Sequence, residues 1–250
     1  MKKITTILID GDILAFRAAL AVEYAVCWDA DQDLWSLTAD AREAKQRLDL
    51  EVLRLQQRLD APKVLITFSD KTNFRKGVLP TYKWNRKGIR KPTVLPVLRD
   101  YCIATYKTRV LPTLEADDVL GILGTSRTLK GPKIIVSDDK DLLQIPGYVY
   151  RPSEDVIHKI SRKQADRWFL TQALTGDATD GYSGLPGCGP KTAEKILQVG
   201  CWGEVVEAYE KKGLNEAEAL TQARLARILR AGDYNLKRKK LKLWTPGAPK

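Results

Sequence analysis

The sequence predicts an α/β fold with a parallel sheet, followed by a region that consists of helices. Apolar runs typical of buried strands alternate with segments of helical periodicity in the first 160 residues, and this alternation indicates a parallel sheet. The expected strands are ITTILI (4–9), KVLITF (63–68) and KIIV (133–136). From residue 161 the pattern is helical, with one further strand-like stretch at 240–244. We therefore expect an α/β domain over 1–160 and a helical region over 161–250.

The helices are expected where apolar residues recur at helical spacing. In the segment 40–60 these residues run from Leu48 to Leu59, and Pro62 follows the helix end. The other expected helices are 96–106, 115–129, 161–174, 190–198, 202–212 and 216–230.

The charge of the chain favours a polyanionic partner. Its 250 residues include 42 Lys and Arg against 31 Asp and Glu, a formal net charge of +11. Nucleic acid is the first candidate and a membrane surface a weaker one, because no segment is apolar for about 18 residues. A merely basic globular protein is the alternative. Asp10 and Asp12 interrupt the apolar N-terminal run too early for an export signal, and the four cysteines lack zinc spacing, so we expect reduced thiols in a cytoplasm.

The single histidine, His158, excludes much chemistry. Ser-His-Asp and Cys-His mechanisms would have to use it, and the usual zinc sites need more than one such ligand. It lies in a polar stretch and is expected at the surface. If the protein is an enzyme, carboxylates and lysines carry its chemistry.

Aspartates follow three separate strands, in ILID, ITFSD and IIVSDD. Ligands of parallel sheets bind at the carboxyl ends of the strands, so Asp10, Asp70 and Asp139 should converge at one rim. The stretch LEADD (114–118) opens a helix whose first turn can face the same rim. Turn and cap roles are the alternative for each aspartate.

Carboxylates gathered at one rim would repel each other unless cations compensated for them. The acids at these loop and helix starts are Asp10, Asp12, Asp70, Glu115, Asp117, Asp118, Asp138, Asp139 and Asp141. Mg²⁺ and Mn²⁺ prefer oxygen ligands, and two such ions can activate water and stabilise the leaving oxygen in phosphodiester cleavage. The alternative is an ordinary helix start, since the helix dipole favours acids there. Glu115 and Asp118 lie three apart on one helix face, so Asp117 is expected to point away from a cation that they share.

A basic and aromatic segment at 75–91 follows the second strand. Its Lys and Arg residues are Arg75, Lys76, Lys83, Arg86, Lys87, Arg90 and Lys91, and it contains no acid. Basic side chains neutralise phosphates, and aromatic rings such as those of Tyr82 and Trp84 stack on unpaired nucleobases. The segment therefore indicates a nucleic-acid clamp over the rim. A solvated basic loop is the alternative. A second basic run, KRKKLK (237–242), is less specific.

A glycine-rich turn is the most specific signal. The stretch GLPGCGPKTA contains Gly184, Gly187, Gly189, Pro190, Lys191 and Thr192. Glycines allow a tight turn, proline starts a helix, and the helix N-terminus and Lys191 favour a phosphate, which is how a helix–hairpin–helix binds DNA backbone. Asp177 and Asp180, just before the turn, would complete the metal site. A plain helix connector is the alternative.

Taken in order, the strand-end aspartates, EADD, DKDLLQ and GDATDGYSGLPGCGPKTA resemble the 5′-nuclease (flap endonuclease) superfamily from residue 4 to about 200. Within it, FSDKTNFRK, YKWNRK, GDATDGYSG and QARLARILRAGDYN are most similar to the 5′→3′ exonucleases of T-odd (T-seven-type) podophages. The resemblance implies a PIN-like sheet flanked by helices, a helical arch at about 72–98 and a helix–three-turn–helix motif at about 176–200.

The resemblance also implies hydrolysis from the 5′ ends of duplex DNA, and of RNA paired to DNA, with two Mg²⁺ or Mn²⁺ ions. The implied metal-bearing residues are Asp10, Asp70, Glu115, Asp117, Asp118, Asp139, Asp141, Asp177 and Asp180. Lys83 and Arg86 would act as catalytic residues near the scissile phosphate, with Tyr82 as a stacking partner. The implied DNA contacts are Arg75, Lys76, Tyr82, Lys87, Gly184, Gly187, Gly189, Lys191 and Thr192. In parts of the family the carbonyls of the glycine turn hold K⁺.

Asp12 and Asp138 depart from the family pattern as extra acids, and the short arch leaves open whether a 5′ strand threads through it. A monomer in the cytoplasm of a bacterial host cell, acting on ends, nicks or flaps, is expected. Flap endonuclease activity is the alternative. IDGDILAF also resembles the start of haloacid-dehalogenase-type phosphatases, whose first Asp is a nucleophile. A DNA-structure-binding protein without catalysis is a third hypothesis.

Overall fold

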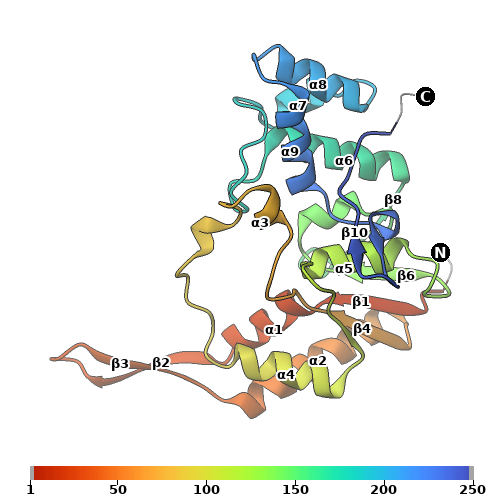
Figure 1. The fold of residues 1–250 in the computed structure, drawn as a ribbon. Helices are drawn as coiled ribbons and strands as arrows, with labels where there is room; N and C mark the ends of the chain where they lie inside the picture. The colour runs from red at the N-terminus through yellow and green to blue at the C-terminus, as the bar shows by residue number, and fades with distance from the viewer. Residues whose placement is uncertain (1–2, 248–250) are drawn as a thin grey trace.

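A six-stranded sheet forms the centre of the molecule (Figure 1). The computed structural model describes residues 3–247. In spatial order the strands are β5 (Thr108–Arg109), β4 (Lys63–Thr67), β1 (Thr6–Asp10), β6 (Lys133–Val136), β7 (Gly147–Arg151) and β8 (Val156–Ile160). The first five are parallel, and β8 returns antiparallel to β7. The predicted α/β fold with a mostly parallel sheet is confirmed.

Strand β1 lies at the middle of the sheet and is buried on both faces. Ile7 and Ile9 face one apolar core, whereas Leu8 faces the other. A strand covered on both sides needs an unbroken apolar run, which explains why TILI shows no alternation.

Helices cover both faces of the sheet. The helices on one face are α1 (Gly11–Leu20), α2 (Ala41–Leu59) and α4 (Leu95–Thr105), and α5 (Ala116–Thr125) covers the other. Helix α1 was not expected from the sequence; Asp10 caps it by accepting a hydrogen bond from the Ile13 amide. Helix α5 ends at 125 rather than 129, because Ser126 adopts an extended backbone. None of the helices within residues 3–247 is both long and apolar enough to cross a bilayer.

The helical region has a core of its own and also returns to the sheet. Its helices are α6 (Arg162–Thr175), α7 (Pro190–Ile196), α8 (Trp202–Glu210) and α9 (Glu216–Ala226). Beyond α9, Ile228, Leu229 and Tyr234 pack into the core beside α5. Short elements complete this end of the chain: η3 (Ala231–Asp233), β9 (Tyr234–Asn235) and β10 (Lys240–Leu241). The segment 228–241 therefore packs with the α/β domain, although it lies beyond the expected boundary at 160.

Side chains from the α/β domain satisfy the carbonyls at the end of α9. Arg75 donates to the carbonyls of Leu225 (2.9 Å) and Arg227 (2.6 Å), and Gln144 donates to that of Ala226 (2.8 Å). The last carbonyls of a helix have no partners within the helix. These three bonds fix α9 to the sheet-bearing part of the molecule.

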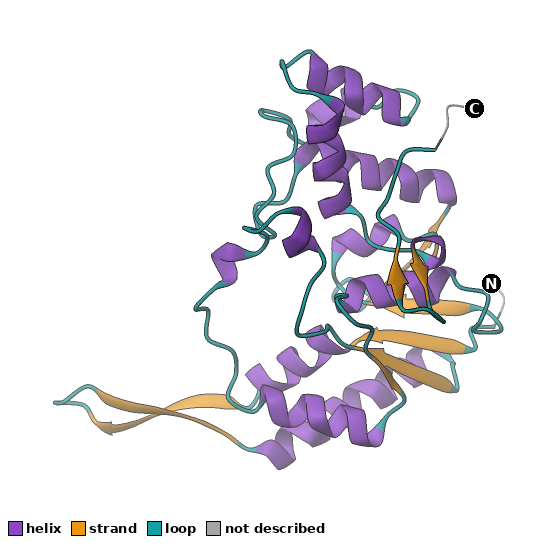
Figure 2. Cartoon of the chain, in the orientation of Figure 1, coloured by secondary structure: helices purple, strands orange, loops and turns teal. Residues whose placement is uncertain are grey.

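The segment expected to be a helical arch is mostly irregular. Between residues 72 and 94 it contains only the four-residue α3 (Arg75–Val78) and the short 3₁₀ turn η1 (Trp84–Arg86), joined by loops (Figure 2). The expectation of a helical arch is corrected accordingly. The segment leaves the sheet, reaches the helical region and returns to α4 (Figure 1).

A two-stranded hairpin, β2 (Glu23–Asp29) and β3 (Leu34–Ala39), was not expected from the sequence. It projects from the body of the molecule as an arm (Figure 1). Most of its side chains are exposed on both faces, so its sequence lacks the alternation that indicates a half-buried strand.

Candidate metal and nucleic-acid site

The carboxyl ends of β1 and β6, the start of α5 and the loop before the glycine turn enclose a cavity of about 380 Å³, which we call the acid pocket. The acids that line it are Asp10, Asp12, Glu115, Asp117, Asp139, Asp141, Asp177 and Asp180. Residues separated by 170 positions in the sequence thus meet at one rim, as parallel strands require.

Asp10 lies at the floor of the acid pocket. Its oxygens accept hydrogen bonds from the Ile13 amide (3.1 Å) and the Ser137 hydroxyl (3.3 Å). Burial, together with the charges of Asp12 and Asp139, raises the pKa of Asp10 to about 7 against the opposing effect of these bonds. The folded protein therefore disfavours a negative charge here unless a cation compensates for it.

The structure reverses the roles expected for Asp117 and Asp118. Asp117, expected to point away, faces the acid pocket; burial raises its pKa well above the ordinary value, and Asp10 and Asp139 add to the shift. Its Oδ1 is buried and has no hydrogen-bond partner. Asp118 is fully buried, and Arg75 pairs with both of its oxygens, at 2.7 and 2.9 Å.

Arg75 is therefore the cation that Glu115 and Asp118 share. Its guanidinium is 3% exposed and also donates to Glu115 (3.1 Å). Burial disfavours the charged form of Glu115, but Arg75 and Lys83 outweigh this effect and lower its pKa to about 2. The expectation that Arg75 contacts DNA is corrected, because its charge is consumed within the protein.

Basic side chains from the 75–91 segment close one side of the acid pocket. Lys83 Nζ lies 2.5 Å from Glu115 Oε1 and 3.4 Å from Asp180 Oδ2. Arg86 pairs with Asp180 at 2.7 Å. The Tyr82 hydroxyl lies 2.8 Å from Asp180 and 3.1 Å from Glu115, and the ring is 2% exposed. A stacking role for Tyr82 is corrected, since its ring is not accessible to a base.

A lysine and a glutamine that were not singled out in the sequence hold the other side of the pocket. Burial raises the pKa of Asp141 to about 6, and Asp139 adds to the shift. Lys140 Nζ lies 3.1 Å from Asp141 and 3.3 Å from Asp177, and Gln172 donates to Asp141 (2.5 Å). The signal for Lys140 was its position between two acids in DDKDLL; Gln172 has no local signal.

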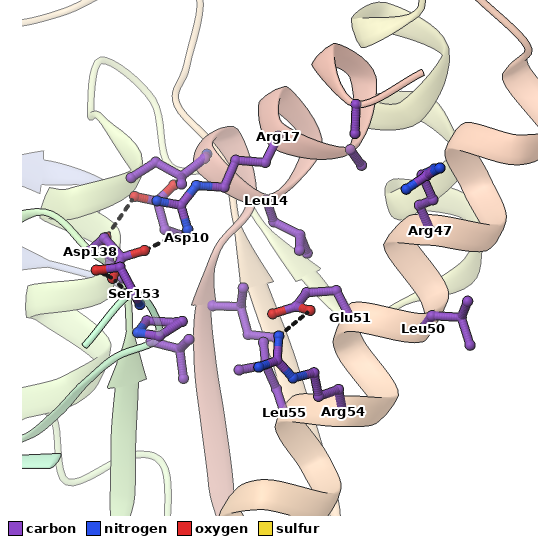
Figure 3. Close-up of a pocket in the computed structure, with 17 residues that line it drawn as sticks. Asp10, Leu14, Arg17, Arg47, Leu50, Glu51, Arg54, Leu55, Asp138 and Ser153 are labelled. Carbon is purple, nitrogen blue, oxygen red and sulfur yellow. Dashed lines mark hydrogen bonds and ion pairs between the residues drawn. The ribbon is translucent and has the colours of Figure 1, made fainter. Parts of the chain in front are cut away.

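Besides Asp118, two further expected acids lie outside the acid pocket. Asp70 accepts from the Thr72 hydroxyl (2.7 Å) and the Thr113 amide (2.8 Å), which lower its pKa to about 2, and it does not line the acid pocket. Asp138 pairs with Arg17 of α1 in a neighbouring groove, which shares Asp10 and Ile13 with the acid pocket (Figure 3). The extra acid Asp12, by contrast, lines the acid pocket.

The glycine turn follows the acid pocket along the chain. Gly184 has φ +64°, and a Cβ there would lie 2.3 Å from the Gly176 amide nitrogen, so two glycines meet back to back. Gly187 also has a positive φ (+74°), and Gly189 is the N-cap of α7. Lys191 and Thr192 are exposed on the first turn of that helix.

Further basic residues face solvent. Lys76 and Lys87 are exposed, and Lys87 lies over the Trp84 ring at 4.6 Å from its centre. Trp84 is itself 63% exposed. Neither lysine pairs with an acid among the described residues, and most of the Trp84 side chain is open to solvent.

The donors of the acid pocket suit hard divalent cations. All are carboxylate oxygens, and the buried Asp117 oxygen lacks a partner. As they stand, no three Asp, Glu, His or Cys side chains within residues 3–247 lie close enough together to hold one ion. Instead, Lys83 and Lys140 each lie between two acids, so a divalent cation would displace these lysines and draw the carboxylates inward.

An acid pocket at the carboxyl edge of a parallel sheet, flanked by an exposed basic segment, defines an α/β nuclease. The profile of the "5′-3′ exonuclease, N-terminal resolvase-like domain" matches residues 5–164. The exodeoxyribonuclease of Enterobacteria phage T3 is 30% identical, with 96% of this chain and 92% of the relative covered. The exonuclease of Escherichia phage T7 is 29% identical over 96% and 93%. The chain belongs to the 5′-3′ exonuclease family.

Solved structures agree on the fold. The T5 D15 protein co-crystallised with metal ions matches with a TM-score of 0.65 at 17% identity, covering 89% of this chain and 88% of that one. The T5 D15 flap endonuclease in complex with DNA and metal ions matches with a TM-score of 0.66 at 16% identity over 89% and 88%. The protein is thus an enzyme, a 5′-3′ nuclease, and the predicted resemblance is confirmed.

Proposed function

We propose that this enzyme hydrolyses phosphodiester bonds from the 5′ ends of duplex DNA with two divalent ions, Mg²⁺ or Mn²⁺. The observation that carries the proposal is the uncompensated acid group of Asp10 and Asp117 in a pocket flanked by basic side chains. Family membership supplies the direction of cleavage. Membership of the 5′-3′ exonuclease family also speaks against the haloacid-dehalogenase and non-catalytic hypotheses.

Two groups of carboxylates would hold the ions. Asp10, Asp117 and Asp139 interact electrostatically on one side of the acid pocket. The second group is Asp141, Asp177 and Asp180, which line the same pocket. When bound, the ions would supply an activated water and stabilise the charge that develops on the leaving oxygen.

Lys83 and Arg86 are proposed to bind the scissile phosphate. Both are held at the pocket by acids, Lys83 by Glu115 and Asp180, and Arg86 by Asp180. A phosphate at the pocket would accept hydrogen bonds from these groups in place of Asp180. Tyr82 keeps a positioning role, because its hydroxyl contacts both acids.

The duplex would extend over the exposed lysine side chains and the glycine turn. Support comes from exposed Lys76, Lys87, Lys191 and Thr192, and from the tight turn at Gly184. The proposal includes K⁺ at this turn and RNA in RNA–DNA hybrids as a second substrate. A dependence of duplex binding on K⁺, absent when Na⁺ replaces it, would test the first point.

The decisive experiment compares products from 5′-labelled blunt, nicked and flapped duplexes with Mg²⁺ and with chelator. Mononucleotides from blunt and nicked ends, lost with chelator, are expected. Release of the whole flap as the dominant product would favour the flap endonuclease alternative. Asp139→Ala should abolish cleavage while duplex binding is retained, and full turnover in excess chelator would overturn the proposal.

A further inference from the structure

The β2–β3 arm, residues 23–39, exposes large apolar side chains without a use in the nuclease site. Trp28 and Trp35 are 68% and 55% exposed, and Tyr24 and Leu34 are also exposed. Within residues 3–247, β2 has extensive contacts only with β3 (Figure 1). Apolar surface concentrated in this way on a globular protein marks a contact with another molecule.

The charge of the arm identifies the kind of molecule. Residues 23–39 contain four acids, Glu23, Asp29, Asp31 and Asp33, and neither lysine nor arginine. The arm therefore carries −4 in a chain of +11, which leaves +15 on the remainder. A polyanion such as DNA is repelled by this surface, and so is a second acidic arm.

The root of the arm is tied to the body of the molecule. Arg90 pairs with Glu23 at 2.6 Å, and the Thr93 amide donates to the same carboxylate at 2.7 Å. These contacts compensate the charge of Glu23. Asp31 and Asp33 at the tip remain exposed.

A groove of about 550 Å³ lies between α1, α2 and the carboxyl end of β6 (Figure 3). Ala21, which lines it, comes two residues before the arm begins at Glu23. Leu14, Leu50 and Leu55 line it together with Arg47 and Arg54. The two arginines pair with single carboxylates on their own helix, yet their side chains are 51% and 73% exposed. Leu50 is 64% exposed. Three acids line the groove as well, Asp10, Glu51 and Asp138, but they are 4%, 34% and 11% exposed. The exposed rim of the groove therefore combines apolar surface with positive charge, the complement of the arm.

We propose that the arm docks into the α1–α2 groove of a second copy of this chain. The tryptophans would cover the apolar floor, and Asp31 and Asp33 would pair with Arg47 and Arg54. In a dimer with twofold symmetry each arm would occupy the groove of the other copy, so the two contacts are equivalent and the assembly is closed. This assembly differs from the monomer expected from the sequence.

The test is the molar mass of the purified full chain, measured by sedimentation equilibrium over a concentration series. A dimer is expected for the native chain. The tip variant Asp31→Arg with Asp33→Arg, and the groove variant Arg47→Glu with Arg54→Glu, should each raise the dimer dissociation constant at least tenfold. Trp28→Ser with Trp35→Ser should do the same.

Charge exchange separates docking from misfolding. All four charge substitutions in one chain should restore the dimer. An equimolar mixture of tip and groove variants should also form dimers, because each heterodimer joins one native and one reversed contact. A native chain that stays monomeric at every concentration would overturn the proposal. So would variants that keep the dimer, or a tip variant that loses duplex binding at unchanged mass, which would assign the arm to DNA.

Discussion

At the scale of single residues, neighbouring Asp117 and Asp118 show what sequence can and cannot determine. Both were predicted at the rim, and both are at the start of α5. Which of the two faces the pocket depends on Arg75, which lies 43 positions before Asp118. In the sequence Arg75 looks like any other basic residue of a basic segment. Its burial is set by α9, and nothing near it in the sequence indicates that.

Replacing these two acids by alanine should separate chemistry from stability. Asp118→Ala leaves Arg75 buried with a weakened set of partners, and loss of one partner from a buried pair costs about 3–5 kcal/mol of unfolding free energy. Asp117→Ala removes a carboxylate that repels its neighbours, so the free energy of unfolding without metal should be unchanged or higher. Cleavage should be lost. Urea unfolding in the presence of chelator measures the stability of each variant, and a cleavage assay measures its activity. Equal destabilisation by the two substitutions would contradict these roles.

The raised pKa values predict how metal binding depends on pH. Carboxyls whose folded pKa is raised, Asp10 to about 7 and Asp141 to about 6, stabilise the metal-free fold at low pH, and this contribution is lost as pH rises through 6 and 7. The pKa values of Glu115 and Asp70 are lowered to about 2, so these two carboxylates stabilise the fold above that range and lose this contribution only at much lower pH. With chelator, the melting temperature should fall between pH 5 and 8.

A bound Mg²⁺ ion would supply the missing positive charge, so its stabilising effect on the fold should grow over the same pH interval. Thermal unfolding with and without saturating Mg²⁺ at pH 5.5 and 8 measures this difference. A magnesium-induced shift of equal size at both values would show that the raised groups are not involved in binding.

At the scale of elements, the strands that end in aspartate were predictable because a doubly buried strand needs a continuous apolar run. The arm was not, since its turn ADQD has no Gly and both of its faces are exposed. The segment expected to be a helical arch is mostly irregular. Its short helix α3 is held in place by the buried side chain of Arg75 rather than by an apolar periodicity of its own.

The glycine turn permits a matched comparison. Gly184 has a positive φ and no room for a Cβ beside Gly176, so Gly184→Ala should destabilise the fold and weaken duplex binding. Gly189→Ala is the control, because its φ is −85° and no atom lies within 4 Å of an added Cβ. Unfolding free energies and duplex affinities should change far more for the first variant. Similar losses for both would show that the turn is not conformationally demanding.

At the scale of the whole molecule, the acid pocket pairs with only a few of the basic side chains, namely Lys83, Arg86 and Lys140. The other exposed lysines and arginines are expected to govern DNA affinity. Each phosphate that a base neutralises lowers the slope of log affinity against log salt by about 0.9 for duplex DNA. Lys87→Ala should therefore reduce the magnitude of this slope by about one. Lys63→Ala is the control, because Lys63 is exposed at the amino end of β4, on the opposite edge of the sheet. An unchanged slope for Lys87→Ala would remove it from the duplex path.

The contacts of Arg75 have a consequence for the synthesis of the protein. This residue leaves the ribosome long before Leu225 and Arg227, whose carbonyls it needs, and Lys83 likewise precedes Asp180. The pocket therefore cannot take its final form until nearly all of the chain has been translated. A nascent chain that has not yet reached Asp180 and Arg227 would hold the strand-end aspartates without these contacts, so the acid pocket is assembled late in folding.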